Sequence, residues 1–119
     1  MEWELQGYLY QNFVMDDDGM AYIKITKDIL EQFNATASET SLLVGSLGNV
    51  KGIVAWVIFI EENDAIRVRL RSKGPVINEL AKKYNGGGHP LASGATAYSW
   101  DEVDVIIEDL KHICKSYKK

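Results

Sequence analysis

An unbroken apolar run, from Ile53 to Ile60, constrains the fold of this 119-residue chain more than any other feature. Successive side chains of a strand point to opposite faces, and every residue of IVAWVIFI is apolar, so both faces need cover. The run is too short to cross a membrane as a helix. It therefore predicts a central strand that is buried on both sides.

A strictly alternating segment, residues 66–72 (IRVRLRS), follows after a short acidic turn. Its apolar residues fall on one face of a strand, and Arg67, Arg69 and Arg71 fall on the other. Side chains on one face of a strand are about 6.6–6.8 Å apart, which is comparable to the phosphate spacing of an extended single strand of nucleic acid. Arginines placed side by side repel one another, and a face made only for folding would more naturally mix charges. The pattern favours a phosphate-binding surface over a solvated sheet face.

The first part of the chain reads as strands and short helices. Residues 7–14 and 20–26 are strand-like, and Asp18-Gly19 between them is a hairpin signal. Thr26 is expected to cap a short helix over residues 27–33.

A second short helix is expected to start at Thr36, where Glu39 three residues later completes a capping box. This helix would turn Leu42 and Leu43 inward and fray at the glycines that follow.

Two helices are expected in the second half. Gly74 and Pro75 would open one that packs Val76 and Tyr84 on the sheet and stops at the glycines of residues 86–88. Ala95 to Tyr98 would form a short strand. Ser99 and Glu102 would cap the last helix, whose apolar stripe has helical spacing: Val103, Ile106, Ile107, Leu110, Ile113, Cys114 and Tyr117. These elements predict a single α+β domain, a mixed β-sheet covered by helices.

The net charge of −4 is unevenly distributed. Residues 1–66 carry 3 basic and 11 acidic side chains (−8), and residues 67–119 carry 10 and 6 (+4). Residues 67–98 hold six basic side chains against one acid, Glu79. An anionic partner would be attracted to this window, although charge alone favours a solvated face that happens to be basic.

Composition excludes several classes. The single cysteine, Cys114, excludes an internal disulfide framework and a multi-cysteine zinc site. The first ten residues carry acids where an export signal needs bases, so a cytoplasmic location without membrane contact is expected. His89 and His112 lie far apart, and Asp16 to Asp18 read as a solvated hairpin tip. No catalytic residue, metal ligand or cofactor is expected in this chain.

The segment GGGHPLASG, residues 86–94, is the second informative motif. Consecutive glycines allow backbone N–H groups to converge on an anion, and Pro90 biases His89 away from helical geometry. His89 could then donate to a phosphate or a base edge, and Ser93 could add a hydroxyl. The same residues taken alone fit a glycine-rich turn around a satisfied histidine equally well.

Together, the two motifs carry a family resemblance. The string RLRSKGPVINELAKKYNGGGHPLASGA, residues 69–95, resembles the C-terminal substrate-binding domain of DHH-family phosphoesterases, nearest the bacterial nanoRNase/pAp-phosphatase branch. RecJ-type exonucleases and cyclic-dinucleotide phosphodiesterases are broader kin. The resemblance is strongest over residues 65–98 and looser over residues 1–64. It implies one DHH-associated nucleotide- or nucleic-acid-binding domain over residues 1–119.

The resemblance also implies the binding residues. Arg71 and Ser72 match the family's Arg-Ser pair, the glycines and His89 match its glycine-histidine loop, and Lys73 and Arg69 are added on charge and alternation. The expected substrate-binding set is Arg69, Arg71, Ser72, Lys73, Gly86, Gly87, Gly88, His89, Ser93 and Gly94.

The catalytic half of the family is missing from these residues. Its members resemble one another in an N-terminal domain with Asp-His-His and acidic motifs that bind two manganese ions, so this chain is expected to be inactive without that domain. The expected ligands are short RNA, pAp (adenosine 3′,5′-bisphosphate), a cyclic dinucleotide or single-stranded DNA, and a homodimer is left open. The alternative is a stand-alone binding or dimerisation module of the kind found in alanyl-tRNA synthetases, which an apolar patch around Trp3, Tyr8 and Tyr10 would favour.

Overall fold

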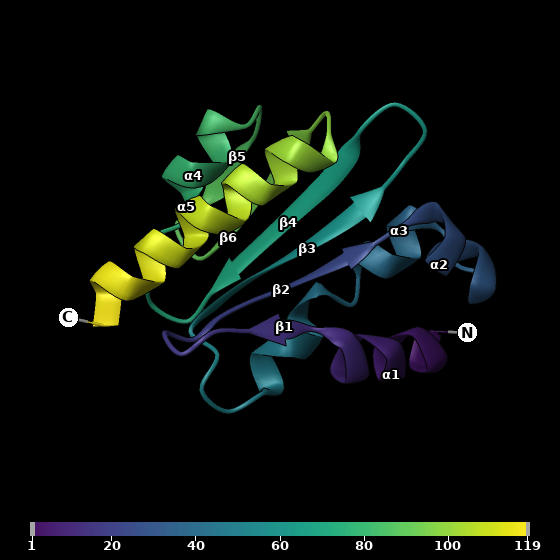
Figure 1. Ribbon diagram of the computed structural model, residues 1–119, viewed down its shortest axis with the longest axis horizontal. Coiled ribbons are helices and arrows are strands. Elements are labelled where there is room, and N and C mark those ends of the chain that lie inside the picture. Colours follow the sequence, from purple (N-terminus) through teal and green to yellow (C-terminus); the bar gives the residue numbers. More distant parts are fainter. Residues whose placement is uncertain (1, 119) are drawn as a thin grey trace.

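Six strands form one mixed sheet in a computed structural model that describes the backbone of residues 2–118 and the side chains of residues 4–118 (Figure 1). The strand order is β1-β2-β3-β4-β6-β5, and only β2 and β3 are parallel. The strands are β1 (Val14–Met15), β2 (Met20–Ile25), β3 (Ala55–Glu61), β4 (Ile66–Ser72), β5 (Gly87–His89) and β6 (Ala92–Ala97).

Helices cover the sheet in two layers. The helices are α1 (Glu2–Asn12), α2 (Lys27–Gln32), α3 (Ala37–Ser41), the 3-10 helix η1 (Val44–Asn49), α4 (Asn78–Lys83) and α5 (Trp100–Lys118). One core joins the sheet to α4 and α5, and the other joins it to α1, α2, α3 and η1. The predicted α+β architecture, a mixed sheet covered by helices, is confirmed.

The central strand β3 packs into both cores. Val57 and Phe59 belong to the core under α4 and α5, while Trp56, Ile58 and Ile60 belong to the core on the other side. All five side chains are buried, so the prediction of a strand covered on both faces is confirmed.

The second helical layer covers only part of its sheet face. Among the described residues, its core takes strand residues from β2 and β3 and none from β4, β5 or β6. On β4 the apolar residues alternate inward toward α4 and α5, and Arg67, Arg69 and Arg71 are half-buried on the other side. We call this side of β4, β6 and β5, which the second layer covers only in part, the arginine face.

Residues 7–14 were predicted as a strand, and this prediction is wrong. Helix α1 continues to Asn12, and only Val14 and Met15 pair with β2. Leu5 and Leu9 lie one helical turn apart and are both fully buried, which is the pattern that anchors the helix. The tyrosines, which favour strands, mask that spacing in the sequence.

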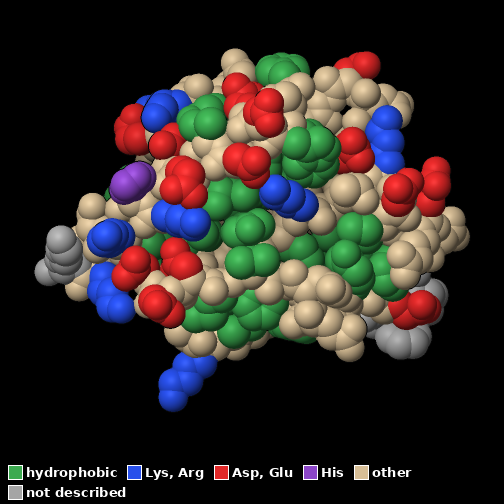
Figure 2. Space-filling model, viewed as in Figure 1, with side chains coloured by type: hydrophobic (Ala, Val, Ile, Leu, Met, Phe, Trp, Pro, Cys, Tyr) green, Lys and Arg blue, Asp and Glu red, His purple; other side chains and the backbone are tan. Residues whose placement is uncertain are grey.

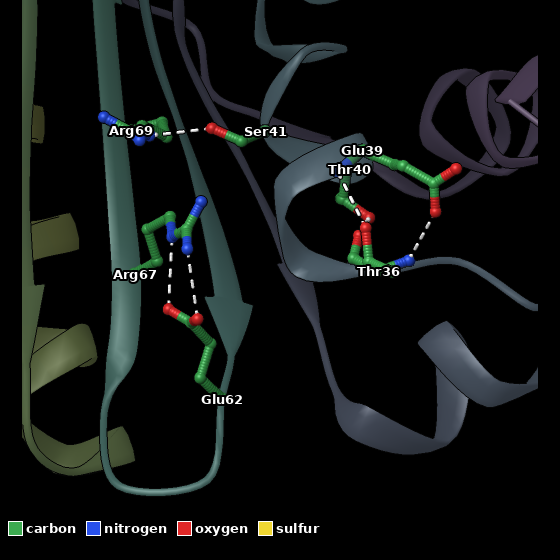
Figure 3. Close-up of polar contacts among 7 residues, drawn as sticks. All are labelled: Thr36, Glu39, Thr40, Ser41, Glu62, Arg67 and Arg69. Atoms are coloured by element: carbon green, nitrogen blue, oxygen red, sulfur yellow. Dashed lines mark hydrogen bonds and ion pairs between the residues drawn. The ribbon is translucent and has the colours of Figure 1, made fainter.

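The helices differ from the expectation at three further points, two of them helix ends and one the burial of a helix face. The capping box of Thr36 and Glu39 forms as predicted, with bonds of 3.1 and 2.9 Å (Figure 3), but the helix ends so early that Leu42 is 78% exposed. Helix α4 begins only at Asn78, since Ile77 has a non-helical backbone (φ −121°, ψ −2°), and Val76 is exposed. In α5 the stripe is buried except for the half-buried Ile113 and the exposed Tyr117.

The cap of α5 and the glycine segment of residues 86–88 also differ in detail from what the sequence predicts. The Ser99 hydroxyl accepts the Glu102 N–H at 3.1 Å, but the Glu102 carboxylate accepts the N–H of Tyr98 rather than that of Ser99. The segment expected to be a glycine loop contributes an edge strand, β5, which pairs with β6. Within residues 2–118, no helix has the length and apolar character needed to cross a membrane.

Candidate functional site

Strand pairing assembles the candidate site on the arginine face. Arg69 pairs with Gly94, and Gly94 pairs with Gly87, so the three residues form one row across β4, β6 and β5. The neighbouring row places His89 two strands away from Arg71. Directly paired residues of antiparallel strands share a face, and adjacent strands are about 4.7–4.9 Å apart. Five of the predicted site residues therefore share one open surface.

Arg67 is already occupied on this surface. Its Nε and Nη2 atoms each lie 3.1 Å from a carboxylate oxygen of Glu62, in the two-pronged geometry that suits guanidinium and carboxylate (Figure 3). Three like charges were expected on this face from the alternation of β4. The structure instead neutralises one of them, which leaves Arg69 and Arg71.

Arg69 ties the strand to α3. Its Nε donates to the Ser41 hydroxyl at 2.8 Å (Figure 3). Its guanidinium lies over Gly94, where an added Cβ would stand only 2.8 Å from Nη1. The absence of a side chain at Gly94 therefore allows the guanidinium to lie against the sheet.

Arg71 has only neutral partners. Its Nη1 donates to the carbonyl oxygens of Leu70, at 2.9 Å, and Ser93, at 3.5 Å. Burial, and then the charge of Arg69, lower the pKa of Arg71 from its usual value. A guanidinium nevertheless stays protonated in proteins. No described carboxylate forms an ion pair with either Arg69 or Arg71, so this end of the face carries uncompensated positive charge.

The two predicted serines face away from the arginine face and hold turns in place. The buried Ser72 hydroxyl accepts the N–H of Gly74 at 3.0 Å and donates to the carbonyl of Val54 at 3.5 Å. The buried Ser93 hydroxyl donates to the His89 carbonyl at 2.7 Å. In this structure their hydroxyls fix the backbone that carries Lys73 and His89, both of which are exposed.

The glycines of the motif have different local requirements. A Cβ at Gly86 would overlap the carbonyl of Gly94, and Gly88 has a φ of +142°, a conformation that favours glycine. The Gly86 N–H donates to the Ala81 carbonyl at 3.0 Å, so it does not point toward a bound anion. By contrast, a Cβ at Gly87 would meet nothing within 4 Å.

A hollow of about 520 Å³ lies beside the arginines, and we call it the β4–β6 hollow. Its lining includes groups that the sequence reasoning missed, because only the fold brings them together. The lining residues are Glu62, Ala65, Arg67, Arg69, Asn85, Gly87, Gly94, Ala95 and Thr96. Among them, only Asn85 has a local sequence signal. An asparagine directly before a glycine favours a positive φ, and Asn85 adopts one here.

The other face of the sheet is different in character. Over α5, lysines and acids are interspersed (Figure 2), and several form ion pairs, including Lys24 with Asp104 at 2.9 Å and Lys83 with Asp109 at 3.1 Å. The Tyr84 hydroxyl donates to the same Asp109 carboxylate at 2.7 Å. Mixed charges of this kind are typical of a solvated surface.

Metal-ligating and apolar candidates elsewhere are weaker. Across residues 4–118, no group of three or more His, Cys, Asp or Glu side chains is placed to hold a metal ion. Of the aromatic patch considered from the sequence, the side chain of Trp3 lies outside the described residues. Tyr8 packs edge-on to Phe33 at 5.4 Å, and the Tyr10 hydroxyl donates to the Ser46 carbonyl at 2.9 Å.

The comparisons with known proteins assign the chain to a known domain family. The family model of the DHHA1 domain matches residues 17–116, and the chain belongs to this family. The resemblance to DHH-family phosphoesterases drawn from the sequence is thereby confirmed.

The relatives are described as nucleotide-processing enzymes. The chain is 61% identical over 115 residues to the bifunctional oligoribonuclease and PAP phosphatase NrnA of Bacillus subtilis, and 48% identical over 113 residues to the probable NrnA of Streptococcus mutans. These matches cover 97% and 94% of the chain but only 37% and 36% of the relatives. The chain thus spans about a third of their length.

Solved structures show the same fold. An exopolyphosphatase-related protein from Bacteroides fragilis matches with a TM-score of 0.78 and 28% identity, over 98% of this chain and 35% of that one. A pGpG-specific phosphodiesterase from Vibrio matches with a TM-score of 0.68 and 15% identity, over 94% of this chain and 39% of that one. The second likeness concerns the fold alone.

Proposed function

We propose that this chain binds the phosphate and nucleotide of short oligonucleotides or of pAp-like nucleotides, as the substrate-binding half of a metal-dependent phosphoesterase. The observation that carries the proposal is the environment of Arg71. Its guanidinium is half-buried on an open sheet face and bonded only to carbonyl oxygens. A phosphate would supply the negative charge that the protein itself leaves out, through a charge-assisted hydrogen bond.

Two neighbouring side chains, Lys73 and His89, can add to this contact, and we call the three residues the phosphate clamp. Lys73 follows directly after β4 and is exposed, and His89 stands on the same face as Arg71, two strands across. Both can donate hydrogen bonds to phosphate oxygens. The backbone turns that carry them are held by Ser72 and Ser93, so these serines contribute to the site by positioning.

The relatives support the substrate class and the division of labour. The two NrnA proteins are described as oligoribonuclease and PAP phosphatase, and this chain matches about a third of each. We assign bond cleavage to a separate DHH domain, which would hold manganese, and the grip on the nucleotide to this chain. A cytoplasmic location belongs to the same proposal.

A titration tests the binding function. Labelled di- to pentaribonucleotides, with and without a 5′-phosphate, are titrated with the wild-type chain at two salt concentrations. We expect tighter binding of the phosphorylated oligomers and an affinity that falls as salt rises. Equal affinity for both forms, with no dependence on salt, would contradict the proposal.

The dimerisation alternative has its own readout. Sedimentation of the same sample reports the oligomeric state, with and without nucleotide. A stable dimer that binds none of the oligomers would favour an interaction module of the synthetase type.

A further inference from the structure

We propose that the β4–β6 hollow receives the base of the bound nucleotide, so that the nucleotide lies along β4 with its phosphate at the Arg71 end. This inference rests on the proposed function and adds a direction and a base-binding subsite to it. Three properties of the hollow carry the inference: its charge, its floor and its polar rim.

The charge of the hollow suits a neutral group. Arg67, at the far end from Arg71, is neutralised by the two 3.1 Å contacts with Glu62. A phosphate placed there would meet a carboxylate as well as a guanidinium, and would be repelled by the former. A nucleobase carries no charge at neutral pH and has no such conflict. The free positive charge instead lies toward Arg71.

The floor of the hollow suits a flat group. Gly87 and Gly94 are paired across β5 and β6, so two neighbouring positions carry no side chain. The Arg69 guanidinium lies beside them over Gly94, with its Nε fixed by Ser41. An aromatic ring can stack on a guanidinium plane, and bases are commonly held in this way. The open space above Gly87, beside this guanidinium, is the space that such a ring would need.

The rim of the hollow can recognise a base edge. Asn85 and Thr96 line it and provide an amide and a hydroxyl, which are neutral donors and acceptors. The volume, about 520 Å³, falls within the range of small-ligand sites. Arg69 and Arg71 are two residues apart on one strand, about 6.6–6.8 Å, so one nucleotide can reach both the hollow and the phosphate clamp.

The test compares a ligand that has a base with one that lacks it. AMP and ribose 5-phosphate share the phosphate and the sugar, and their binding to the 119-residue chain is measured by calorimetry or NMR titration. Stacking of one base is expected to make AMP bind about 5- to 150-fold more tightly than ribose 5-phosphate.

Gly87→Val places a side chain into the hollow. The added Cβ would meet no atom within 4 Å, and valine is favoured in strands, so the fold should be retained. The preference for AMP over ribose 5-phosphate should fall to less than about threefold. Gly7→Val in α1 is the matched control, because Gly7 also has open space around its Cβ and lies outside the arginine face. The control should keep the wild-type preference, and Gly87→Ala replaces Gly87→Val if the valine variant does not fold.

The outcomes separate the two proposals. If the wild type binds both ligands equally well, or if Gly87→Val keeps the preference for AMP, the base subsite is wrong while the phosphate clamp stands. If the wild type binds neither ligand, the proposed function fails and the subsite fails with it.

Discussion

Replacing Arg71 by alanine removes the centre of the phosphate clamp. The guanidinium has no carboxylate partner among the described residues, so the substitution breaks no ion pair within the fold. A hydrogen bond to a charged group contributes about 1.5–3 kcal/mol. Loss of that bond to phosphate should weaken binding about 10- to 150-fold.

The fold should tolerate this change. Only two hydrogen bonds to carbonyl oxygens are lost, one of them 3.5 Å long, and a half-buried charge is relieved of its desolvation cost. We expect the free energy of unfolding to change by less than about 1 kcal/mol. Urea unfolding of the wild type and of Arg71→Ala measures this difference.

The binding assay uses 5′-phosphorylated dinucleotide, two salt concentrations and two companion variants. Arg71→Lys keeps the charge but loses the bidentate hydrogen-bonding geometry of a guanidinium. Its affinity for the dinucleotide should therefore lie between those of the wild type and Arg71→Ala. Lys82→Ala removes one positive charge from an exposed position on α4 and should change the affinity for the dinucleotide by less than about twofold. If Arg71→Ala and Lys82→Ala weaken binding equally, net charge rather than a clamp explains the interaction, and the reasoning is refuted.

Three further predictions concern packing and titration. Gly86→Ala should lower the free energy of unfolding by more than about 2 kcal/mol, because its Cβ would overlap the neighbouring strand, while Gly87→Ala should change it by less than about 1 kcal/mol; denaturant unfolding of the two variants compares them. Burial, followed by a hydrogen bond to a carboxylate of α5, raises the pKa of Tyr84 to about 12. The contribution of the protonated Tyr84 hydroxyl to the free energy of unfolding should therefore be complete below pH 10 and be lost as the pH rises toward 12. Unfolding of the wild type and of Tyr84→Phe across that pH range measures this contribution. An equal loss of stability in both proteins would contradict the prediction. Burial also raises the pKa of the Cys114 thiol to about 12, so a thiol reagent should modify this residue only on unfolding, and rapid modification of the native chain would contradict its placement in the core.

Much of the fold was predictable because hydrophobic periodicity and tertiary packing agree. The run that became β3 and the alternation that became β4 both specify burial directly, since a strand has only two faces. The apolar stripe of α5 specified in the same way which face of that helix is buried. Helix α1 was not predicted, because Leu5 and Leu9 are only two buried anchors among residues that favour strands.

Less of the candidate site was predictable, because it depends on register. Alternation placed Arg69 and Arg71 on one face, but the row through Gly94 and Gly87 exists only because β6 pairs with both β4 and β5. The hydrogen bond from Arg69 to Ser41 joins residues 28 positions apart, and no local pattern announces it. The alternation of β4 already implies that Ser72 faces away from the arginines, whereas no local pattern indicates the same for Ser93.

The glycine motif shows the same division. Gly86 and Gly88 are required by close approach and by backbone conformation, which are structural reasons that the sequence interpretation did not separate from ligand binding. Gly87 is free of both constraints and lines the hollow. One three-residue string therefore contains two kinds of glycine, and substitutions can distinguish them.

Amide chemical shifts of the nitrogen-15-labelled chain, followed during addition of a 5′-phosphorylated diadenylate, test the central claim most directly. We expect the largest changes on the arginine face, at Arg71, Lys73 and His89 first and then at Gly87 and Gly94. Amides of α5 should stay unchanged, although that helix carries several lysines. Changes confined to α5, or no change at any site up to millimolar dinucleotide, would contradict the claim that the arginine face binds nucleotide.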